Sequence, residues 1–215
     1  MVFNSIFFIF CFLPVFMLIY YLVPGKLRNL LLFLGSLIFY AWGEPVYVIL
    51  MLFSSVFNYY MGTELERLYY DDRKQKINLI FSIIVNLGIL VFFKYYGFLL
   101  NTIGGITGIH IPHPELSLPI GLSFYTFRNL SYLFDIYLSK VNAQRNCLTF
   151  AVYSTMFPYT SAGPIVRYAD IEEQLDKRTI NISKFGIGAE LFVKGLLNIL
   201  LYILRQIFNR HSILS

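Results

Sequence analysis

Long apolar runs alternate with short polar connections along the whole chain. Apolar residues dominate residues 3–23, 27–42, 46–61 and 77–100, and turn or charged residues separate these runs. A helix needs about 20 predominantly apolar residues to cross a bilayer, and the second run is the shortest of the four. The pattern predicts an all-α protein, a polytopic membrane helical bundle.

The stretch from Leu118 to Tyr137 breaks this simple pattern. It has the length and aromatic content of a membrane helix, yet it carries polar side chains: Ser123, Thr126, Arg128, Asn129, Ser131 and Asp135. At about 100° per residue, Arg128, Ser131 and Asp135 fall on one helix face. Ionisable groups at the centre of a membrane helix cost about 2.5–3.5 kcal/mol, which makes them functional candidates. The alternative is that Arg128 and Asp135 only join neighbouring helices.

A second irregular stretch follows the apolar run at residues 146–163. Pro158, Gly163 and Pro164 break a helix there, and Arg167 comes shortly after. Irregular backbone at membrane depth is tolerated only where it is buried in protein or lines a water-filled cavity. We therefore expect a re-entrant segment that forms a second wall of a polar cavity. The alternative is a proline-kinked span with Arg167 at the headgroups.

Charge sets the expected orientation. The most charged segment, residues 64–76, is predicted to be a solvated loop or helix extension, and residues 101–117 contain no Lys or Arg. Basic residues favour the cytoplasmic side of short loops, so the basic loops should be cytoplasmic and the N-terminus outside.

The last third of the chain is simpler. Residues 170–181 are polar and mixed in charge, which predicts a solvated interfacial helix, and residues 185–204 form the last apolar run. Glu190 and Lys194 are spaced for an i,i+4 ion pair within it. No soluble domain is left over, so we expect one membrane domain over residues 1–215.

Composition supports the membrane assignment. Hydrophobic residues make up 57% of the 215 residues and charged residues 13%, with a mean hydropathy of +0.64. Soluble domains are about 25% charged. The net charge of +5 is explained by membrane-flanking loops, and no nucleic-acid recognition motif accompanies it. We expect a multi-pass protein of the cell membrane, with the lipid bilayer as its partner and no nucleic acid.

No catalytic constellation can be assembled from neighbouring residues. His110 and His113 form a lone His-x-x-His without further ligands, and the two cysteines lie in separate apolar contexts. These are weak signals for a metal, so we expect no metal site.

Two motifs carry a family resemblance. The first reads Pro-Ile-Gly-Leu-Ser-Phe-Tyr-Thr-Phe from Pro119, followed by Ser-Tyr-Leu-Phe-Asp-Ile-Tyr from Ser131. The second extends from Phe157 to Tyr168 and reads Phe-Pro, then Ala-Gly-Pro-Ile-Val-Arg-Tyr from Ala162. Together they resemble the membrane-bound O-acyltransferase family. Within that family, the chain is most similar to the bacterial branch of alginate O-acetylation and teichoic-acid D-alanylation. The resemblance extends over residues 1–195.

The resemblance implies a multi-helix fold with re-entrant pieces around a central tunnel. A cytoplasmic donor, acetyl-CoA or a carrier thioester, would supply the acyl group, and no cofactor would stay bound. The acceptor would be a hydroxyl of an extracellular or cell-wall polysaccharide, reached directly or through an extracytoplasmic acyltransferase partner. The polar residues of the two irregular stretches are the candidates for lining the tunnel: Ser123, Thr126, Arg128, Asn129, Ser131, Asp135, Pro158, Gly163, Pro164 and Arg167.

The chain also departs from the family. The family's catalytic histidine lies in later helices, beside a Trp-x-x-Trp-His stretch, and this sequence ends before either. We therefore assign no catalytic residue. We expect an N-terminal part of the fold that is inactive alone, with an atypical tail at residues 196–215. Arg128 also stands where the family is expected to have glutamine.

Two alternatives lie outside this reading. One is a non-enzymatic solute channel or transporter-like bundle that uses the face of Arg128 and Asp135. The other is an assembly pseudo-enzyme that keeps the fold without the chemistry.

Overall fold

The computed structural model describes residues 7–107, 118–160, 165–178 and 181–214, and this part of the chain is helical with no strand. The all-α prediction is confirmed. In chain order the elements are η1 (Phe8–Phe12), α1 (Leu13–Leu22), η2 (Gly25–Leu27), α2 (Arg28–Gly43), α3 (Val48–Arg67), α4 (Asp72–Thr107), α5 (Leu122–Tyr137), α6 (Cys147–Thr155), η3 (Phe157–Tyr159), α7 (Tyr168–Asp176) and α8 (Ile182–Leu214).

The chain forms two compact units, Met1–Asp176 and Lys177–Ser215. Elements η1 to α7 belong to the first unit, and α8 makes up most of the second. The expectation of one membrane domain over residues 1–215 stays a prediction.

Helix α4 is the element best suited to crossing a membrane. Its residues Asp72–Phe98 have a mean hydropathy of 2.1, and they are mostly unburied. It is the one helix of the described part that is both long and apolar enough, while Phe8–Leu22 is a shorter apolar helix. The multi-pass arrangement therefore remains a prediction.

The charged segment at residues 64–76 is mainly helical. Helix α3 continues to Arg67 and α4 begins at Asp72, so only a short turn separates them. Of the two predicted forms, a helix extension describes this segment better than a loop. The i,i+3 pairs Arg67–Glu64 and Lys74–Asp71 are compatible with helical ends.

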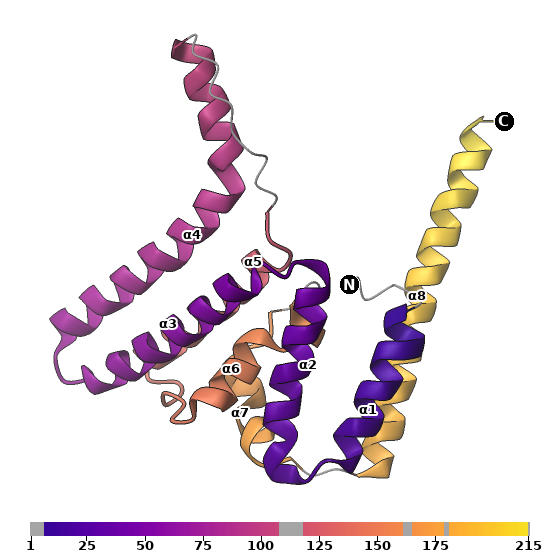
Figure 1. The fold of residues 1–215 in the computed structure, drawn as a ribbon, viewed down its shortest axis with the longest axis horizontal. Helices are drawn as coiled ribbons and strands as arrows, with labels where there is room; N and C mark the ends of the chain where they lie inside the picture. Colours follow the sequence, from indigo (N-terminus) through magenta and orange to yellow (C-terminus); the bar gives the residue numbers. More distant parts are fainter. Residues whose placement is uncertain (1–6, 108–117, 161–164, 179–180, 215) are drawn as a thin grey trace. The chain divides into compact units, whose positions relative to one another are not determined.

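Helix α5 lies at the centre of the first unit. It contacts α3 and α4, while α6 contacts α2 and α3 (Figure 1). Ten of the 16 residues of α5 are buried, polar ones included. The stretch singled out for its polar residues is therefore the element that the others surround.

A small residue allows one of these helix contacts. A Cβ atom added to Gly62 of α3 would lie 2.7 Å from Cε1 of Tyr132 on α5. Small residues at helix interfaces let two backbones approach closely, as is common in membrane helix pairs. Because Gly62 has no side chain, the Tyr132 ring fits between α3 and α5.

The helix break predicted at Pro158 is present. Helix α6 ends at Thr155, Met156 is extended with ψ 119°, and only the single turn η3 follows. The backbone N–H of Phe157 donates to Oγ of Ser36 on α2, at 3.1 Å. The break is thereby fixed against a neighbouring helix, and its re-entrance into a membrane stays a prediction.

The second unit has its own predicted feature. Lys194 Nζ lies 2.6 Å from Glu190 Oε1, so the expected i,i+4 ion pair is confirmed within α8. The helix continues beyond the apolar run predicted at residues 185–204, as far as Leu214.

Candidate functional site

Arg128 joins the two irregular stretches of the sequence. Its side chain is buried, with 2% exposed. Nη1 donates to the carbonyl oxygens of Tyr153, at 2.9 Å, and Ser154, at 3.4 Å, and Nη2 donates to the carbonyl of Tyr159. One guanidinium group therefore holds the end of α6 and the turn η3 against α5.

The end of α6 is a favourable place for this cation. The last carbonyls of a helix have no partners within it and carry the negative end of the helix dipole. The guanidinium carbon of Arg128 also lies 5.9 Å from the ring centre of Tyr153 and 5.6 Å from that of Tyr159. Aromatic faces attract cations at such distances. These contacts explain how a charge is accommodated inside the helical unit.

Gly121 is the second point where the two stretches meet. It precedes α5 with φ at +77°, a left-handed conformation that glycine adopts without strain. A Cβ atom at this position would overlap the carbonyl oxygen of Thr160, the residue that follows η3. The start of α5 can reach this turn only because position 121 has no side chain.

The start of α5 is also tied to the turn after α2. The backbone N–H of Ile120 donates to Oε2 of Glu44, at 2.8 Å. Glu44 is the residue that ends α2. The carboxylate fixes the direction in which the chain enters α5.

Asn129 belongs to a buried polar network among α3, α4 and α5. Its Nδ2 donates to Oγ of Ser54, at 3.2 Å. Asn58 and Asn86 exchange two amide hydrogen bonds, at 3.0 and 2.9 Å, and Asn58 also donates to the carbonyl of Ser54. All four side chains are buried. Hydrogen bonds between helices of this kind join membrane bundles.

The sequence reasoning missed this network, although a signal for it exists. Ser54 and Asn58 lie four residues apart in one apolar run, and Ser82 and Asn86 repeat the spacing in the next. Such pairs mark a polar stripe on a helix that must face protein rather than lipid.

Asp135 is buried without the partner expected of an ionised group. It is 5% exposed, and its Oδ2 has no hydrogen-bond partner within the described part of the chain. No ion pair among the described residues joins it to Arg128. The two residues share the buried side of α5, but they do not neutralise each other.

The remaining candidates lie in different surroundings. Thr126 is buried, and Ser123 and Ser131 are half-buried, whereas the side chains of Pro158 and Arg167 are exposed. Gly163 and Pro164, and also His110 and His113, lie outside the described residues. The role of these positions in lining a tunnel stays a prediction.

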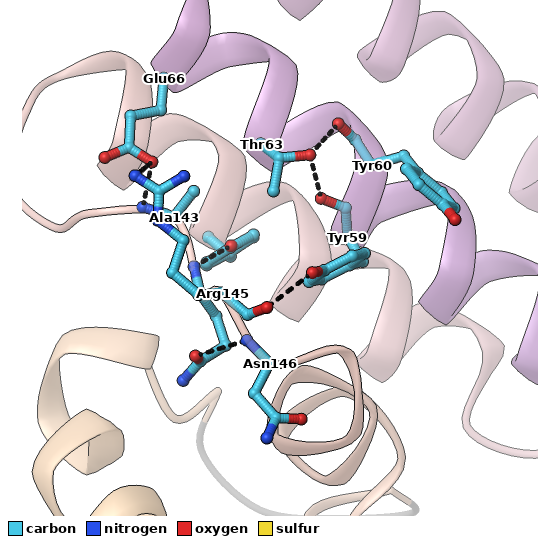
Figure 2. Close-up of polar contacts among 9 residues, drawn as sticks. Tyr59, Tyr60, Thr63, Glu66, Ala143, Arg145 and Asn146 are labelled. Carbon is cyan, nitrogen blue, oxygen red and sulfur yellow. Dashed lines mark hydrogen bonds and ion pairs between the residues drawn. The ribbon is translucent and has the colours of Figure 1, made fainter.

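The connection between α5 and α6 is fastened to α3. Oε2 of Glu66 accepts the backbone N–H of Ala143, at 3.2 Å, and lies 3.0 Å from Nη2 of Arg145 (Figure 2). The hydroxyl of Tyr59 donates to the carbonyl of Arg145, at 2.8 Å (Figure 2). Two side chains of one helix thus hold the loop that leads into α6.

Two tyrosines also form hydrogen bonds with this loop. The backbone N–H of Gln144 donates to the hydroxyl of Tyr132, at 3.0 Å, and its side-chain amide donates to the hydroxyl of Tyr168, at 2.8 Å. The rings of Tyr132 and Tyr168 meet edge to face, with centres 5.1 Å apart. The first residue of α7 is therefore linked to α5 through Gln144.

These groups position backbone more than they offer reactive atoms. Arg128 and Asn129 supply hydrogen-bond donors, but Arg128 is already engaged with three carbonyls. A general base has to reach the proton that it abstracts, and its pKa should lie near the working pH. Asp135 is the one carboxylate among the site candidates, and no described contact links it to a hydroxyl.

Comparisons with known proteins reveal relatives over most of the chain. It is 37% identical over 199 residues to the probable alginate O-acetylase AlgI of Pseudomonas aeruginosa, which covers 91% of this chain and 38% of that protein. The AlgI protein of Azotobacter vinelandii is 36% identical over 199 residues, covering 91% and 40%. A peptidoglycan O-acetyltransferase of Helicobacter pylori is 30% identical over 228 residues, covering 91% and 43%.

This chain spans about two fifths of the length of these curated relatives. No family model matches the chain, and no solved structure matches it. The resemblance that the two motifs indicated is confirmed by these relatives.

Proposed function

We propose that this chain, which is similar over 91% of its length to the alginate O-acetylases, forms part of a membrane O-acetyltransferase. The acceptor class is hydroxyl groups of an extracellular or cell-wall polysaccharide. This class is suggested by the names of the relatives, which refer to alginate and to peptidoglycan.

The observation that carries the proposal is the contact between the two motif stretches. Arg128 and Gly121 of the first meet Tyr159 and Thr160 at the edge of the second. Residues 31 positions apart (Arg128 and Tyr159) and 39 apart (Gly121 and Thr160) are thereby brought together in the first unit. A family site built from both motifs requires such a contact.

The proposed arrangement in the membrane follows the charge pattern. The turn between α3 and α4 and the loop between α5 and α6 would face the cytoplasm, where the acyl donor is located. The donor would be acetyl-CoA or a carrier thioester. An extracytoplasmic acyltransferase could receive the group on the opposite side.

Acyl transfer needs catalytic groups that the described part of this chain does not supply. Attack by a hydroxyl needs a general base, and the negative charge that develops on the carbonyl oxygen needs donors. Exclusion of water suppresses hydrolysis of the donor. We propose that the described unit supplies the positioned backbone, and that the base belongs to a protein of the relatives' length.

The channel alternative gains no support from Arg128. A solute-binding face would leave the guanidinium free to meet the solute, whereas Arg128 donates to three carbonyls of its own chain. Asp135 alone is not enough to define a solute site.

The test is acetyl transfer from labelled acetyl-CoA in membranes. The 215-residue chain is compared with a version extended to the length of the relatives, with polysaccharide as acceptor. The proposal expects transfer by the extended version and none by the chain alone. Transfer by neither version, with both present in the membrane, would contradict the assigned activity.

A further inference from the structure

A hollow of about 650 Å³ lies at the turn between α3 and α4. The end of α5 contributes to it as well. Its lining combines tyrosines with polar and charged side chains: Tyr69, Tyr70, Asp72, Gln75, Lys76 and Tyr137.

One lining residue, Gln75, is held by a hydrogen bond, and two others are exposed tyrosines. Gln75 is 5% exposed, and its Nε2 donates to the carbonyl of Leu65, at 3.1 Å. The rings of Tyr69 and Tyr70 meet edge to face with centres 5.3 Å apart, and Tyr70 is 96% exposed. Tyrosine is enriched at membrane interfaces, where an apolar ring and a polar hydroxyl are both satisfied.

Lys76 is the cation that this hollow leaves available. It is exposed, and the described part of the chain offers it no ion-pair partner. The neighbouring Lys74 differs, because its Nζ lies 2.8 Å from Oδ2 of Asp71. Hydrogen bonds from the Lys74 side chain and backbone lower the pKa of Asp71, so this pair stays ionised and closed on itself.

One carboxylate also lines the hollow. Asp72 begins α4, where the backbone N–H groups and the positive end of the helix dipole favour a negative charge. Its charge is stabilised by its own helix, and no ion pair joins it to Lys76 among the described residues.

An apolar stripe begins on α4 beside Lys76, since Ile80 follows Lys76 by four residues, one helical turn. Ile77, Ile80, Phe81 and Ile84 are between 46% and 63% exposed. Their spacing of i, i+3, i+4 and i+7 places them on one face of the helix. Lys76, the cation of the hollow, therefore lies next to an apolar surface that runs along α4.

We propose that this hollow and stripe bind one anionic phospholipid. The phosphate of the headgroup lies at Lys76 among the tyrosine hydroxyls, and an acyl chain lies along Ile80 and Ile84. An ion such as free phosphate would use the hollow but leave the stripe unoccupied. A neutral phospholipid would use the stripe, but its headgroup would bring no net negative charge to Lys76.

The test uses the chain purified in a neutral detergent. Short-chain phosphatidylglycerol, phosphatidylcholine or inorganic phosphate is titrated in, and the unfolding temperature is recorded at each concentration. Ligands that bind only the folded state raise this temperature, and a tighter ligand does so at a lower concentration. We expect phosphatidylglycerol to stabilise the chain at lower concentration than phosphatidylcholine, and inorganic phosphate to have no effect.

Two variants assign the effect to the hollow. Lys76→Gln should weaken the apparent affinity for phosphatidylglycerol about five-fold, the size expected for one lysine at an anionic lipid surface. Lys94→Gln is the matched control, because Lys94 is exposed on the same helix but lies over the ring of Tyr95, at 5.5 Å, away from the hollow. Unfolding temperatures without lipid show that both variants fold.

The proposal is overturned by any of three results. It fails if phosphatidylcholine equals phosphatidylglycerol in effect, if the two lysine variants lose affinity equally, or if inorganic phosphate reproduces the stabilisation. The last result would mean an anion site without a lipid.

Discussion

Arg128 illustrates how a charged residue is kept inside an apolar unit. Three backbone carbonyls accept hydrogen bonds from it and two tyrosine rings lie near it. Each hydrogen bond to a charged group contributes about 1.5–3 kcal/mol, and losing the donor leaves buried acceptors without partners. Arg128 therefore stabilises the packing of three elements, α5, α6 and η3.

Replacing Arg128 by Ala should lower the free energy of unfolding by about 3 kcal/mol, because the carbonyls of Tyr153 and Tyr159 lose their donor. Arg128→Lys should recover only part of this loss, since an ammonium group cannot span the same set of acceptors. Denaturant titration of the detergent-solubilised chain measures the change. Arg67→Ala is the control, because that side chain is 78% exposed, and it should change stability by under about 1 kcal/mol. Equal effects of the two alanine variants would contradict this role.

Gly121 allows a second test at the residue scale. Gly121→Ala forces an L-residue into the left-handed region and places its Cβ against Thr160, so we expect a loss of about 2 kcal/mol or more. Gly88→Ala has open space around its Cβ within α4. That control should be neutral or stabilising by up to about 1 kcal/mol. Thermal unfolding of the two variants compares them, and a harmless Gly121→Ala would rule out the contact with Thr160.

At the scale of elements, the buried amides hold α3 and α4 together. Asn58 and Asn86 satisfy each other with two hydrogen bonds, so removing either side chain leaves the other without its partner. Replacing both by apolar residues removes that penalty. Coupling between the two helices is therefore measurable in a double-mutant cycle.

The cycle Asn58→Leu, Asn86→Leu and the double variant should show a coupling energy of about 1 kcal/mol, within the range found for hydrogen bonds between membrane helices. Unfolding of the four proteins in detergent measures it. Asn58→Leu with Lys94→Gln serves as the control pair, because the two residues share no partner, and it should be additive within about 0.5 kcal/mol. Additivity of the Asn58 and Asn86 changes would argue against the reciprocal pair.

Helix α7 is expected to respond to pH. Burial raises the pKa of the Glu172 carboxyl, and the carboxylate of Asp176 raises it further. The folded chain then binds this proton more tightly than the unfolded chain, so ionisation above the folded pKa costs stability, and the cost disappears as the pH falls below the ordinary value of 4.5.

Glu172→Gln should therefore be more stable than the parent chain at pH 7, and the gain should vanish near pH 4. Unfolding temperatures measured across this range check the prediction. Glu173→Gln removes the same charge from the exposed neighbour and serves as the control. A gain for Glu172→Gln that grows as the pH falls would contradict the stated sign.

Much of the element pattern could be predicted from local sequence. The apolar runs, the break at Pro158 and the ion pair of Glu190 with Lys194 depend on residues close together in the chain. The continuation of α3 to Arg67 and the early start of α4 were harder to fix, because a charged segment can be a loop or a helix end. The side chain that pairs with a given amide or guanidinium is decided by packing between distant segments.

Arg128 shows the limit of that reasoning for the site. Its burial and importance were predictable from a charge in an apolar helix, whereas its acceptors, the carbonyls of Tyr153, Ser154 and Tyr159, carry no signature in side-chain type. The i,i+4 spacing of Ser54 with Asn58, and of Ser82 with Asn86, carries a sequence signal for the buried amide network. Gly163 and Pro164 remain predictions of the sequence alone.

At the scale of the whole molecule, the central question is how the first unit sits in a membrane. The charge pattern predicts that the turn between α2 and α3 lies outside and the turn between α3 and α4 inside. Both turns expose a side chain: Val46 is 74% exposed and Tyr70 is 96% exposed. These two positions allow the orientation of α3 to be tested directly.

Single cysteines at Val46 and Tyr70, in a background with Cys11→Ser and Cys147→Ser, should react differently with a membrane-impermeant maleimide. We expect Val46→Cys to be labelled in intact cells and Tyr70→Cys only after permeabilisation. Labelling of denatured protein controls for expression. Labelling of both positions from the same side would mean that α3 does not cross the bilayer.

The most direct measurement is acetyl transfer by the extended protein with and without Arg128. Wild type, Arg128→Lys and Arg128→Ala would be assayed in membranes at equal amounts of folded protein, with Arg67→Ala as the control. Because a small displacement of positioned groups can cost about 100-fold in rate, we predict a loss of that order for Arg128→Ala and an unchanged rate for Arg67→Ala. Full activity of folded Arg128→Ala would contradict the claim that Arg128 positions the two motif stretches for acyl transfer.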